Sequence, residues 1–477
     1  MRDRCRLELS PEEMTALVDE VSRRVIDFIS RLPDQPAHSP EGGEELAAAL
    51  REPPPEEGSP LDTILDTLFE RVIPCAFNTA GPGYLAYIPG GGLYSAAVAE
   101  YLAAAVNRYS GVWAAAPGAV EVETQALRWL AQLVGLPEGS LGVLTTGGSF
   151  SNLIAVAAAR EKLLGDDFAQ ATIYFSEEVH YSVPKAARVV GIRPTHFRSI
   201  PVDDEYRLRV DRLEAQILED RAAGLRPLLV CGSVGTVNTG AVDPLADIAD
   251  VAARQSVWFH VDGAYGGVFR MVPELEHLFD GVERADSVAV DPHKGLFLAY
   301  GTGALLVREI DDLRRAYSDT ASYLPEMRQG SEHVDFSFVS PELSRDWRGL
   351  RLWLPFKLHG VRAFREALRE KRQLAVQAFE ALSAEPDIEV AAPPELSLFA
   401  FRQRHPGVDR EEENRRNRRL LGRINAPRRI MVTGTEVGGK YWVRICVLHL
   451  RTHRERVDEG LDIIRESLAA ERRTAGA

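Results

Sequence analysis

Short apolar runs alternate with amphipathic stretches through the middle of the chain, from residue 141 to residue 307. Runs of this length predict buried strands, and the stretches between them predict helices. The predicted strands are Leu141–Thr145, Thr172–Phe175, Pro194–Phe197, Leu228–Cys231, Val257–Val261, Ser287–Val290 and Ala304–Val307. This alternation is typical of an α/β domain that is built on a mostly parallel sheet, here of seven strands.

The first 82 residues lack this alternation and predict two isolated amphipathic helices. Ser10-Pro-Glu-Glu13 has the residues of a helix N-terminus, and apolar residues then recur at helical spacing as far as Ile29. A second apolar helical face runs from Leu61 to Val72. Because neither helix can bury its apolar face alone, we expect an arm that packs on another surface, most simply a partner subunit. An arm folded back on its own domain is the alternative.

The last third of the chain predicts a smaller α+β domain. A long helical segment leads from Asp346 to about Leu382, and the strands expected after it are Leu396–Phe401, Ile430–Val432 and Tyr441–Val447. The predicted division is therefore an N-terminal helical arm over residues 1–82, a large domain over 83–345 and a small domain over 346–477 that includes the connecting helix.

Composition excludes several classes of partner. The 477 residues carry a formal net charge of −14, whereas nucleic acids and anionic membranes attract clustered Lys and Arg. The sequence contains no run of about 18 apolar residues, and it therefore predicts no membrane span. The four cysteines lie far apart and match no metal or disulfide pattern. We therefore expect a cytoplasmic protein that binds neither nucleic acid nor membrane and holds no metal.

A lysine follows one of the predicted strands at the edge of the sheet where ligands collect. Asp291-Pro-His-Lys294 comes directly after Ser287–Val290, and the next strand begins at Ala304. Lys294 is thus expected in a loop at the carboxyl end of a core strand. A lysine shielded from water there is a candidate nucleophile that forms a Schiff base with a carbonyl carbon.

Two other strand ends carry candidate ligands. Gly148 and Ser149 open a helix after the first strand, which suits a phosphate group, although a plain tight turn has the same pattern. Asp262 ends an apolar strand, where a carboxylate needs a partner such as a protonated pyridine nitrogen; a turn-capping role is the alternative. Together with Lys294 these are the three contacts that pyridoxal 5′-phosphate needs, and the conjunction is more specific than any part.

A set of motifs occurs in order along nearly the whole chain. They are Tyr84-Leu-Ala-Tyr-Ile-Pro89, Trp113-Ala-Ala-Ala-Pro117, Glu178-Val-His180-Tyr-Ser, His260-Val-Asp262-Gly-Ala264-Tyr, Ala285-Asp-Ser287, Asp291-Pro-His293-Lys294 and Arg348-Gly-Leu-Arg-Leu-Trp353. These motifs resemble those of the group II pyridoxal-phosphate-dependent amino-acid decarboxylases, the aromatic L-amino acid decarboxylase family. The resemblance implies the aspartate-aminotransferase-like (type I) fold, a homodimer with the active site at its interface, and an N-terminal arm wrapped on the partner.

The resemblance also implies an activity and roles for individual residues. The activity is decarboxylation of an L-amino acid, most simply an aromatic one, to the amine and CO₂. Lys294 would form the Schiff base, Asp262 would meet the ring nitrogen, and His180 would stack on the ring as a catalytic residue, with Ala264 on the other face. The implied phosphate ligands are Gly148, Ser149, Ser287, Asp291 and His293, and the implied substrate pocket contains Tyr87, Ile88, Tyr109 and Trp113.

One departure from the family pattern concerns the proton that completes the reaction. Counting back from Arg348–Trp353, Phe336 falls where many animal and plant members have a proton-donating tyrosine on a mobile loop. A Phe there resembles the aldehyde synthases, whose products are aldehyde, ammonia and peroxide. Tyr323, water, His180 or Lys294 are alternative proton donors, and with them simple decarboxylation is the expected reaction.

Other departures from the family pattern allow more than one class of amino-acid substrate. Thr79, Gly90, Tyr109 and Gly111 differ from the animal aromatic decarboxylases, and Gly295 replaces a common Trp. An acidic or diamino acid, such as glutamate or 2,4-diaminobutyrate, is therefore an alternative substrate. Arg444 could meet a carboxylate, or be an ordinary ion-pair residue. An aminotransferase and a catalytically silent binding protein are disfavoured, because the decarboxylase motifs and the catalytic residues are both present.

Overall fold

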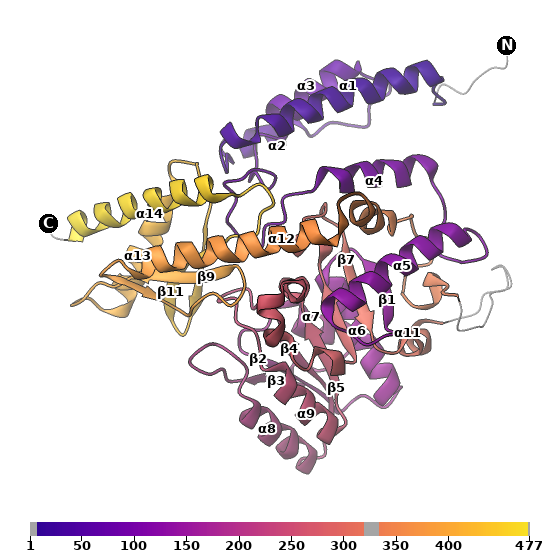
Figure 1. Ribbon diagram of the computed structural model, residues 1–477, viewed down its shortest axis with the longest axis vertical. Helices are drawn as coiled ribbons and strands as arrows, with labels where there is room; N and C mark the ends of the chain where they lie inside the picture. Colours follow the sequence, from indigo (N-terminus) through magenta and orange to yellow (C-terminus); the bar gives the residue numbers. More distant parts are fainter. Residues whose placement is uncertain (1–6, 319–332, 476–477) are drawn as a thin grey trace.

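The computed structural model describes residues 7–318 and 333–475, and its centre is a seven-stranded sheet (Figure 1). The strands are β1 (Leu141–Thr145), β2 (Ala171–Ser176), β3 (Phe197–Ile200), β4 (Arg226–Ser233), β5 (Trp258–Asp262), β6 (Ser287–Val290) and β7 (Gly303–Val307), in the order β1-β7-β6-β5-β4-β2-β3. Strand β7 is antiparallel to both of its neighbours, and all other pairs are parallel. The carboxyl ends of β1, β2, β4, β5 and β6 therefore share one edge.

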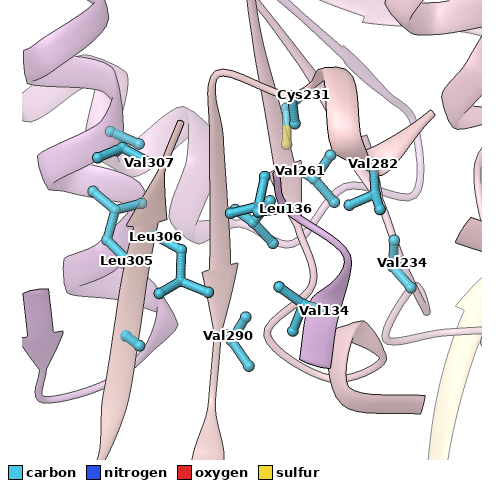
Figure 2. Packing of buried hydrophobic residues seen from close by; sticks show 14 of the residues in the cluster. Val134, Leu136, Cys231, Val234, Val261, Val282, Val290, Leu305, Leu306 and Val307 are labelled. Carbon is cyan, nitrogen blue, oxygen red and sulfur yellow. The ribbon is translucent and has the colours of Figure 1, made fainter. Parts of the chain in front are cut away.

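Helices before, between and after the strands bury the apolar faces of this sheet. They are α4 (Tyr94–Val106), α5 (Pro117–Val134), α6 (Gly148–Leu163), α7 (Ser182–Val189), α8 (Val210–Ala222), α9 (Leu245–Gln255), α10 (Pro292–Gly295) and α11 (Ile310–Tyr317). Figure 2 shows Val134 and Leu136, at the end of α5, packed beside Val261 and Val290 of the central strands. Burial of this kind contributes about 1.5–3 kcal/mol for each large apolar side chain, which is what holds the layers together.

A second, antiparallel sheet forms the small domain. Its strands are β8 (Ile388–Val390), β9 (Leu398–Gln403), β10 (Thr433–Val437) and β11 (Lys440–Cys446), in the order β10-β11-β9-β8. The long helix α12 (Leu350–Ser383), which is interrupted at Gly360 with φ 71°, leads into this domain, and α13 (Arg410–Asn425) and α14 (Arg454–Ala475) pack on it. The type I fold is confirmed, whereas the domain boundaries stay a prediction.

The N-terminal helices lie apart from the rest of the molecule (Figure 1). Helix α1 (Pro11–Ser30) has the predicted capping box between Ser10 and Glu13, and none of its residues is buried. Helix α2 covers Gly43–Ala49, and α3 (Leu61–Thr67) continues as a wider turn to Val72. The connection after α1 packs on the small domain, where the Ala37 N–H donates to the Arg428 carbonyl at 2.7 Å. Helix α1 packs on α3 and its continuation, with the rings of Phe28 and Phe69 6.2 Å apart, but large apolar side chains such as Met14 and Ile26 stay exposed within one chain.

Three local predictions are wrong. Pro194 starts a 3₁₀ turn, since its fixed φ suits a helical start, and the strand begins only at Phe197. Residues 430–432 form no strand of the small sheet, because Met431 pairs instead with Tyr84 in an isolated bridge. Lys294 lies in the short helix α10 rather than in an irregular loop, because Pro292 occupies a first helical position. No described helix is both long and apolar enough to cross a membrane.

Candidate active site

A cavity of about 550 Å³ opens at the shared carboxyl edge of the large sheet. Its walls come from the segments that follow β1, β2, β4, β5 and β6, so that residues from five separate parts of the chain meet there. Of the predicted site residues, Gly148, Ser149, His180, Asp262, Ala264, Asp291, His293 and Lys294 line this cavity. The structure therefore brings together the three contacts that the sequence analysis inferred separately.

Lys294 is held by its own short helix. Its Nζ lies 2.9 Å from Asp291 Oδ2, and the side chain is 22% exposed. The backbone at His293 is covered by Gly90, where a Cβ would lie 2.0 Å from the His293 carbonyl oxygen, so only glycine fits. The amine is thus positioned by a carboxylate three residues earlier and by a glycine loop above it.

Asp262 ends β5 with both carboxylate oxygens bonded. Oδ1 accepts a hydrogen bond from the Ala264 N–H at 3.1 Å, and Oδ2 accepts one from Asn152 Nδ2 at 3.0 Å. The side chain is buried, with 8% exposure for the residue. Two neutral donors therefore fix the orientation of this carboxylate without cancelling its charge.

His180 follows β2 and lines the same cavity. Its Nδ1 lies 2.6 Å from Ser182 Oγ. Burial lowers the pKa of His180 from its ordinary value of 6.5, against an opposing effect of the nearby Asp262. The imidazole is therefore neutral near pH 7.

An anion site lies at the N-terminus of α6. Gly147 has φ 150°, and a Cβ on Gly148 would lie 2.9 Å from Ala264 Cβ, so both positions favour glycine and leave the start of this helix bare of side chains beside the cavity. His293 borders this end and donates from Nδ1 to the Thr302 carbonyl at 2.8 Å, while burial lowers its pKa. Asp291 Oδ1 is buried there without a partner among the described residues.

These residues fit pyridoxal 5′-phosphate. The helix N-terminus suits the phosphate, Asp262 suits a protonated ring nitrogen, and Lys294 is within the same cavity for the aldehyde carbon. The carboxylate beside the anion site, Asp291, is paired with Lys294. The residues of the cavity therefore match the charges of this cofactor as well as its shape.

Two predicted site residues lie elsewhere. Ser287 stands at the opposite end of β6 from Asp291, and its hydroxyl bonds Trp258 and His260, so it is not a phosphate ligand in this structure. Phe336 is not on an exposed loop: it is fully buried, with the Arg345 guanidinium 4.6 Å from its ring centroid. Its apolar ring packs with the core of the large domain instead. Tyr323 lies outside the described residues.

The predicted substrate-pocket residues do not line the cavity of their own chain. Tyr109 donates to the Leu343 carbonyl at 3.1 Å, and Trp113 stacks on His333 at 4.0 Å. Ile88 packs against the core of the large domain. Tyr87 is half exposed at φ 52°, and its carbonyl accepts from Arg444 Nη2 at 3.4 Å. Arg444 is buried and donates to Thr433 Oγ1 at 3.0 Å, and no carboxylate of the described residues pairs with it, so the ion-pair interpretation is not supported.

Sequence reasoning missed several residues of the site. Asn152, Ser182, Lys185, Ser233 and Thr236 also line the cavity. Asn152 stands one helical turn after Gly148, and this spacing places both on one face of α6. The i, i+4 relation to the glycine was therefore a usable signal for Asn152.

Comparison with known proteins decides the family. The model of the pyridoxal-dependent decarboxylase conserved domain matches residues 44–404. The chain belongs to the pyridoxal-dependent decarboxylase family. The predictions of this family, of the cofactor pyridoxal 5′-phosphate and of an amino-acid decarboxylase are thereby confirmed.

Individual members of the decarboxylase family resemble the chain over nearly its whole length. An aromatic-L-amino-acid decarboxylase of Bacillus atrophaeus is 33% identical, over 94% of this chain and 94% of the relative. A phenylacetaldehyde synthase of Petunia hybrida is 30% identical over 96% and 94%. A crystal structure of Oryza sativa TDC with PLP and tryptamine superposes with a TM-score of 0.93 at 29% identity, covering 98% and 99%. Both product classes considered from the sequence thus occur among the relatives.

Proposed function

We propose that this decarboxylase acts on an aromatic L-amino acid, releases the amine and CO₂, and works as a homodimer. The observation that carries the proposal is the meeting of Lys294, Asp262 and His180 in one cavity. Relatives named for aromatic amino acids support the substrate class.

Each cavity residue has a task in this reaction. When bound, pyridoxal 5′-phosphate supplies the electron sink for the bond between Cα and the carboxylate. Lys294 would bond its aldehyde carbon, and Asp262 would keep a proton on the ring nitrogen. Ala264 and His180 would flank the ring. Gly148, Ser149 and His293 would hold the phosphate, with Asp291 beside them.

The position of Phe336 favours the amine over the aldehyde. Within its own chain the ring is buried under Arg345 and does not line the cavity. Because the ring is fully buried inside its own subunit, a hydroxyl at this position would face neither this cavity nor a partner's in this conformation. Lys294 carries an N–H donor inside the cavity, and we assign to this amine the proton that completes the product at Cα.

Aldehyde synthesis is the second candidate function. A Phe at position 336 and the similarity to a phenylacetaldehyde synthase favour it. The two functions differ in their products, because the aldehyde route consumes oxygen and yields ammonia and peroxide.

Open apolar surfaces support the homodimer. Large apolar side chains are exposed on α1, α3 and α4, among them Met14, Leu17, Ile26, Ile64, Val98, Tyr101 and Leu102. Exposed apolar faces on helices are characteristic of subunit interfaces. Tyr109 and Trp113 lie outside the cavity of their own chain, so a partner's cavity is the place where they would line a substrate pocket. The cytoplasmic location stays a prediction.

The dimer can be tested by measuring the mass in solution. We expect twice the chain mass of 52.7 kDa. Replacing Met14 and Leu17 by Glu should shift the protein toward the monomer, because charges would enter the apolar interface. The control replaces exposed Glu12 of the same helix by Gln. A monomeric wild-type protein would contradict this part of the proposal.

The substrate and products can be tested together. Purified protein loaded with cofactor is given aromatic, acidic and diamino L-amino acids in air, and CO₂, amine, aldehyde and peroxide are quantified. We expect amine and CO₂ in equal amounts from an aromatic substrate, without matching peroxide. Aldehyde with peroxide would establish the second candidate, and turnover restricted to acidic or diamino acids would overturn the aromatic assignment.

A further inference from the structure

A continuous chain of hydrogen bonds lies behind the cavity wall. Each of its links is between 2.6 and 2.9 Å long, and every member before His180 is at most 2% exposed. Its members, in order, are Trp258, Ser287, His260, Asn152, Ser182 and His180. Because water does not reach the buried members, the donors and acceptors along the chain must satisfy one another.

The orientation of Asn152 is fixed by Asp262. A carboxylate accepts hydrogen bonds, so the Asn152 amide must direct its NH₂ group to Asp262 Oδ2, at 3.0 Å. This orientation turns Asn152 Oδ1 toward His260 Nε2, at 2.9 Å. An amide oxygen can only accept, and therefore His260 must carry a proton on Nε2.

The bonds at the other end of the chain agree with this answer. The indole N–H of Trp258 can only donate, and it donates to Ser287 Oγ at 2.8 Å. The Ser287 hydroxyl proton is then directed to His260 Nδ1, also at 2.8 Å. Burial lowers the pKa of His260 to about 4, so the ring is neutral and has one N–H, on Nε2. Asp262 therefore sets the direction of the chain through Asn152, and the bonds at the Trp258 end agree with it.

This direction decides what Ser182 does to His180. The second N–H of the Asn152 amide donates to Ser182 Oγ at 2.8 Å. The hydroxyl proton of Ser182 is then directed to His180 Nδ1, at 2.6 Å. The backbone N–H of Ser182 points at the same nitrogen, at 3.3 Å. Two donors on one nitrogen leave no place for a proton on Nδ1.

We propose that Ser182 is a positioning residue, and that the chain from Trp258 holds His180 as the neutral tautomer with its proton on Nε2. No described residue bonds Nε2, and His180 lines the cavity. His180 then presents a fixed N–H donor to whatever occupies the cavity.

The chain also limits the chemistry of His180. A neutral imidazole that gave up its Nε2 proton would need a new proton at Nδ1. Ser182 cannot be reprotonated along the chain, because the amide of Asn152 does not pass protons on. His180 is therefore a hydrogen-bond donor and not the source of the product's proton. This consequence rests on the proposed function, whereas the tautomer does not.

The tautomer can be measured without any turnover. Nitrogen-15 spectra of histidine-labelled protein, recorded with and without cofactor, distinguish a protonated ring nitrogen from an unprotonated one; the His180 signals are those lost in His180→Gln. We expect the wild-type protein to carry the proton on Nε2 and none on Nδ1. A proton on Nδ1 would overturn the proposal, whatever the activity of the enzyme.

Variants separate positioning from mere packing. Ser182→Ala removes the donor to Nδ1, so we expect a mixture of tautomers and a higher pKa of His180, because the lost bond favoured the neutral form. Ser182→Thr keeps the hydroxyl, and it should restore both the single tautomer and the wild-type pKa of His180. The matched control is Ser176→Ala, which removes a buried hydroxyl without a described partner at the end of β2. An unchanged tautomer in Ser182→Ala would overturn the role of Ser182.

Kinetics then test whether the donor matters to the reaction. In Ser182→Ala we expect kcat/KM to fall about 10-fold, the usual effect of one lost positioned hydrogen bond. The acidic limb of its pH profile should also move to higher pH, while Ser176→Ala keeps the wild-type profile. A changed tautomer with unchanged kinetics would refute the catalytic consequence alone.

Discussion

Two carboxylates end neighbouring strands of the large sheet, and their surroundings differ. Asp262, after β5, is bonded by two neutral donors, the Ala264 N–H and the Asn152 amide. Asp291, after β6, is paired with the cation of Lys294, and its other oxygen has no described partner. The first arrangement preserves a negative charge for a ligand, and the second uses the charge within the protein. The same residue type thus has two roles, set by its neighbours.

The largest expected effect on turnover comes from removing Lys294, the cation that pairs with Asp291. Lys294→Ala should lower turnover at least about 1,000-fold, because the group that would bond the cofactor is lost and Asp291 is left unpaired. Turnover and the visible absorption of the cofactor are the measurements. Lys185→Ala, which removes the other cavity lysine, should retain the covalently held cofactor. Turnover that persists without Lys294 would contradict the assignment.

Removing the charge on the Asp262 side should have the next largest effect. Asp262→Asn keeps the size of the side chain but not the charge that would hold a proton on the ring nitrogen. We expect kcat to fall about 100-fold or more while the cofactor still binds. Steady-state kinetics and cofactor titration measure the two quantities. A variant with wild-type kcat would remove the distinction between the two carboxylates.

The matching substitution of the second carboxylate, Asp291, should have only a mild effect on cofactor binding and kcat. Asp291→Asn removes a negative charge beside the anion site, so we expect the Kd for the cofactor to stay equal or to fall, and kcat to change by no more than about 10-fold. Titration of the cofactor-free protein gives the Kd. Much weaker binding would mean that Asp291 serves the cofactor directly, as Asp262 is proposed to do.

A smaller effect is expected on the stability of the protein at low pH, through His260, which is linked to Asp262 by Asn152. His260 has a folded-state pKa of about 4, lowered mainly by burial from an ordinary 6.5. Below pH 6.5 the unfolded chain takes up this proton while the folded chain does not, so the free energy of unfolding falls as the pH drops toward 4. The expected loss is about 2 kcal/mol between pH 6.5 and pH 5.

Urea unfolding at several pH values measures this loss. His260→Asn should be less stable at pH 7 and should have a shallower pH dependence than the wild type. His449, whose pKa burial lowers to about 3, contributes equally to both proteins and serves as an internal reference. The same slope in both proteins would show that His260 takes up its proton in the folded state as well.

The sequence predicted the parts of this molecule that follow from local pattern. Strand β5 and the position of Asp262 at its end follow from an apolar run closed by a charge, and Lys294 follows from a proline after another run. Asn152 shares a helix face with Gly148, but its partners Asp262 and Ser182 could not be predicted in the same way, because they are 110 and 30 residues away. Contacts of this kind depend on which strands become neighbours, and hydrophobic periodicity does not encode that order.

The errors have similar physical causes. Ser287 belongs to a motif near Lys294, but the rise of about 3.3 Å per strand residue puts it at the far end of β6 from the cavity. Counting residues placed Phe336 on a mobile loop, whereas its apolar ring is buried against Arg345. The pocket roles of Tyr109 and Trp113 stay a prediction, because no sequence signal distinguishes a residue of its own subunit's cavity from one that faces a partner.

The central claim is that Lys294 is the residue that bonds the cofactor, with Asp291 as its counter-ion and Asp262 at the other end of the ring. The most direct test is to reduce the cofactor-loaded protein with borohydride, which makes the bond permanent, and to map the modified peptide by mass spectrometry. We predict the added mass on Lys294. Modification of Lys185, the other lysine of the cavity, or of no lysine at all would contradict the account.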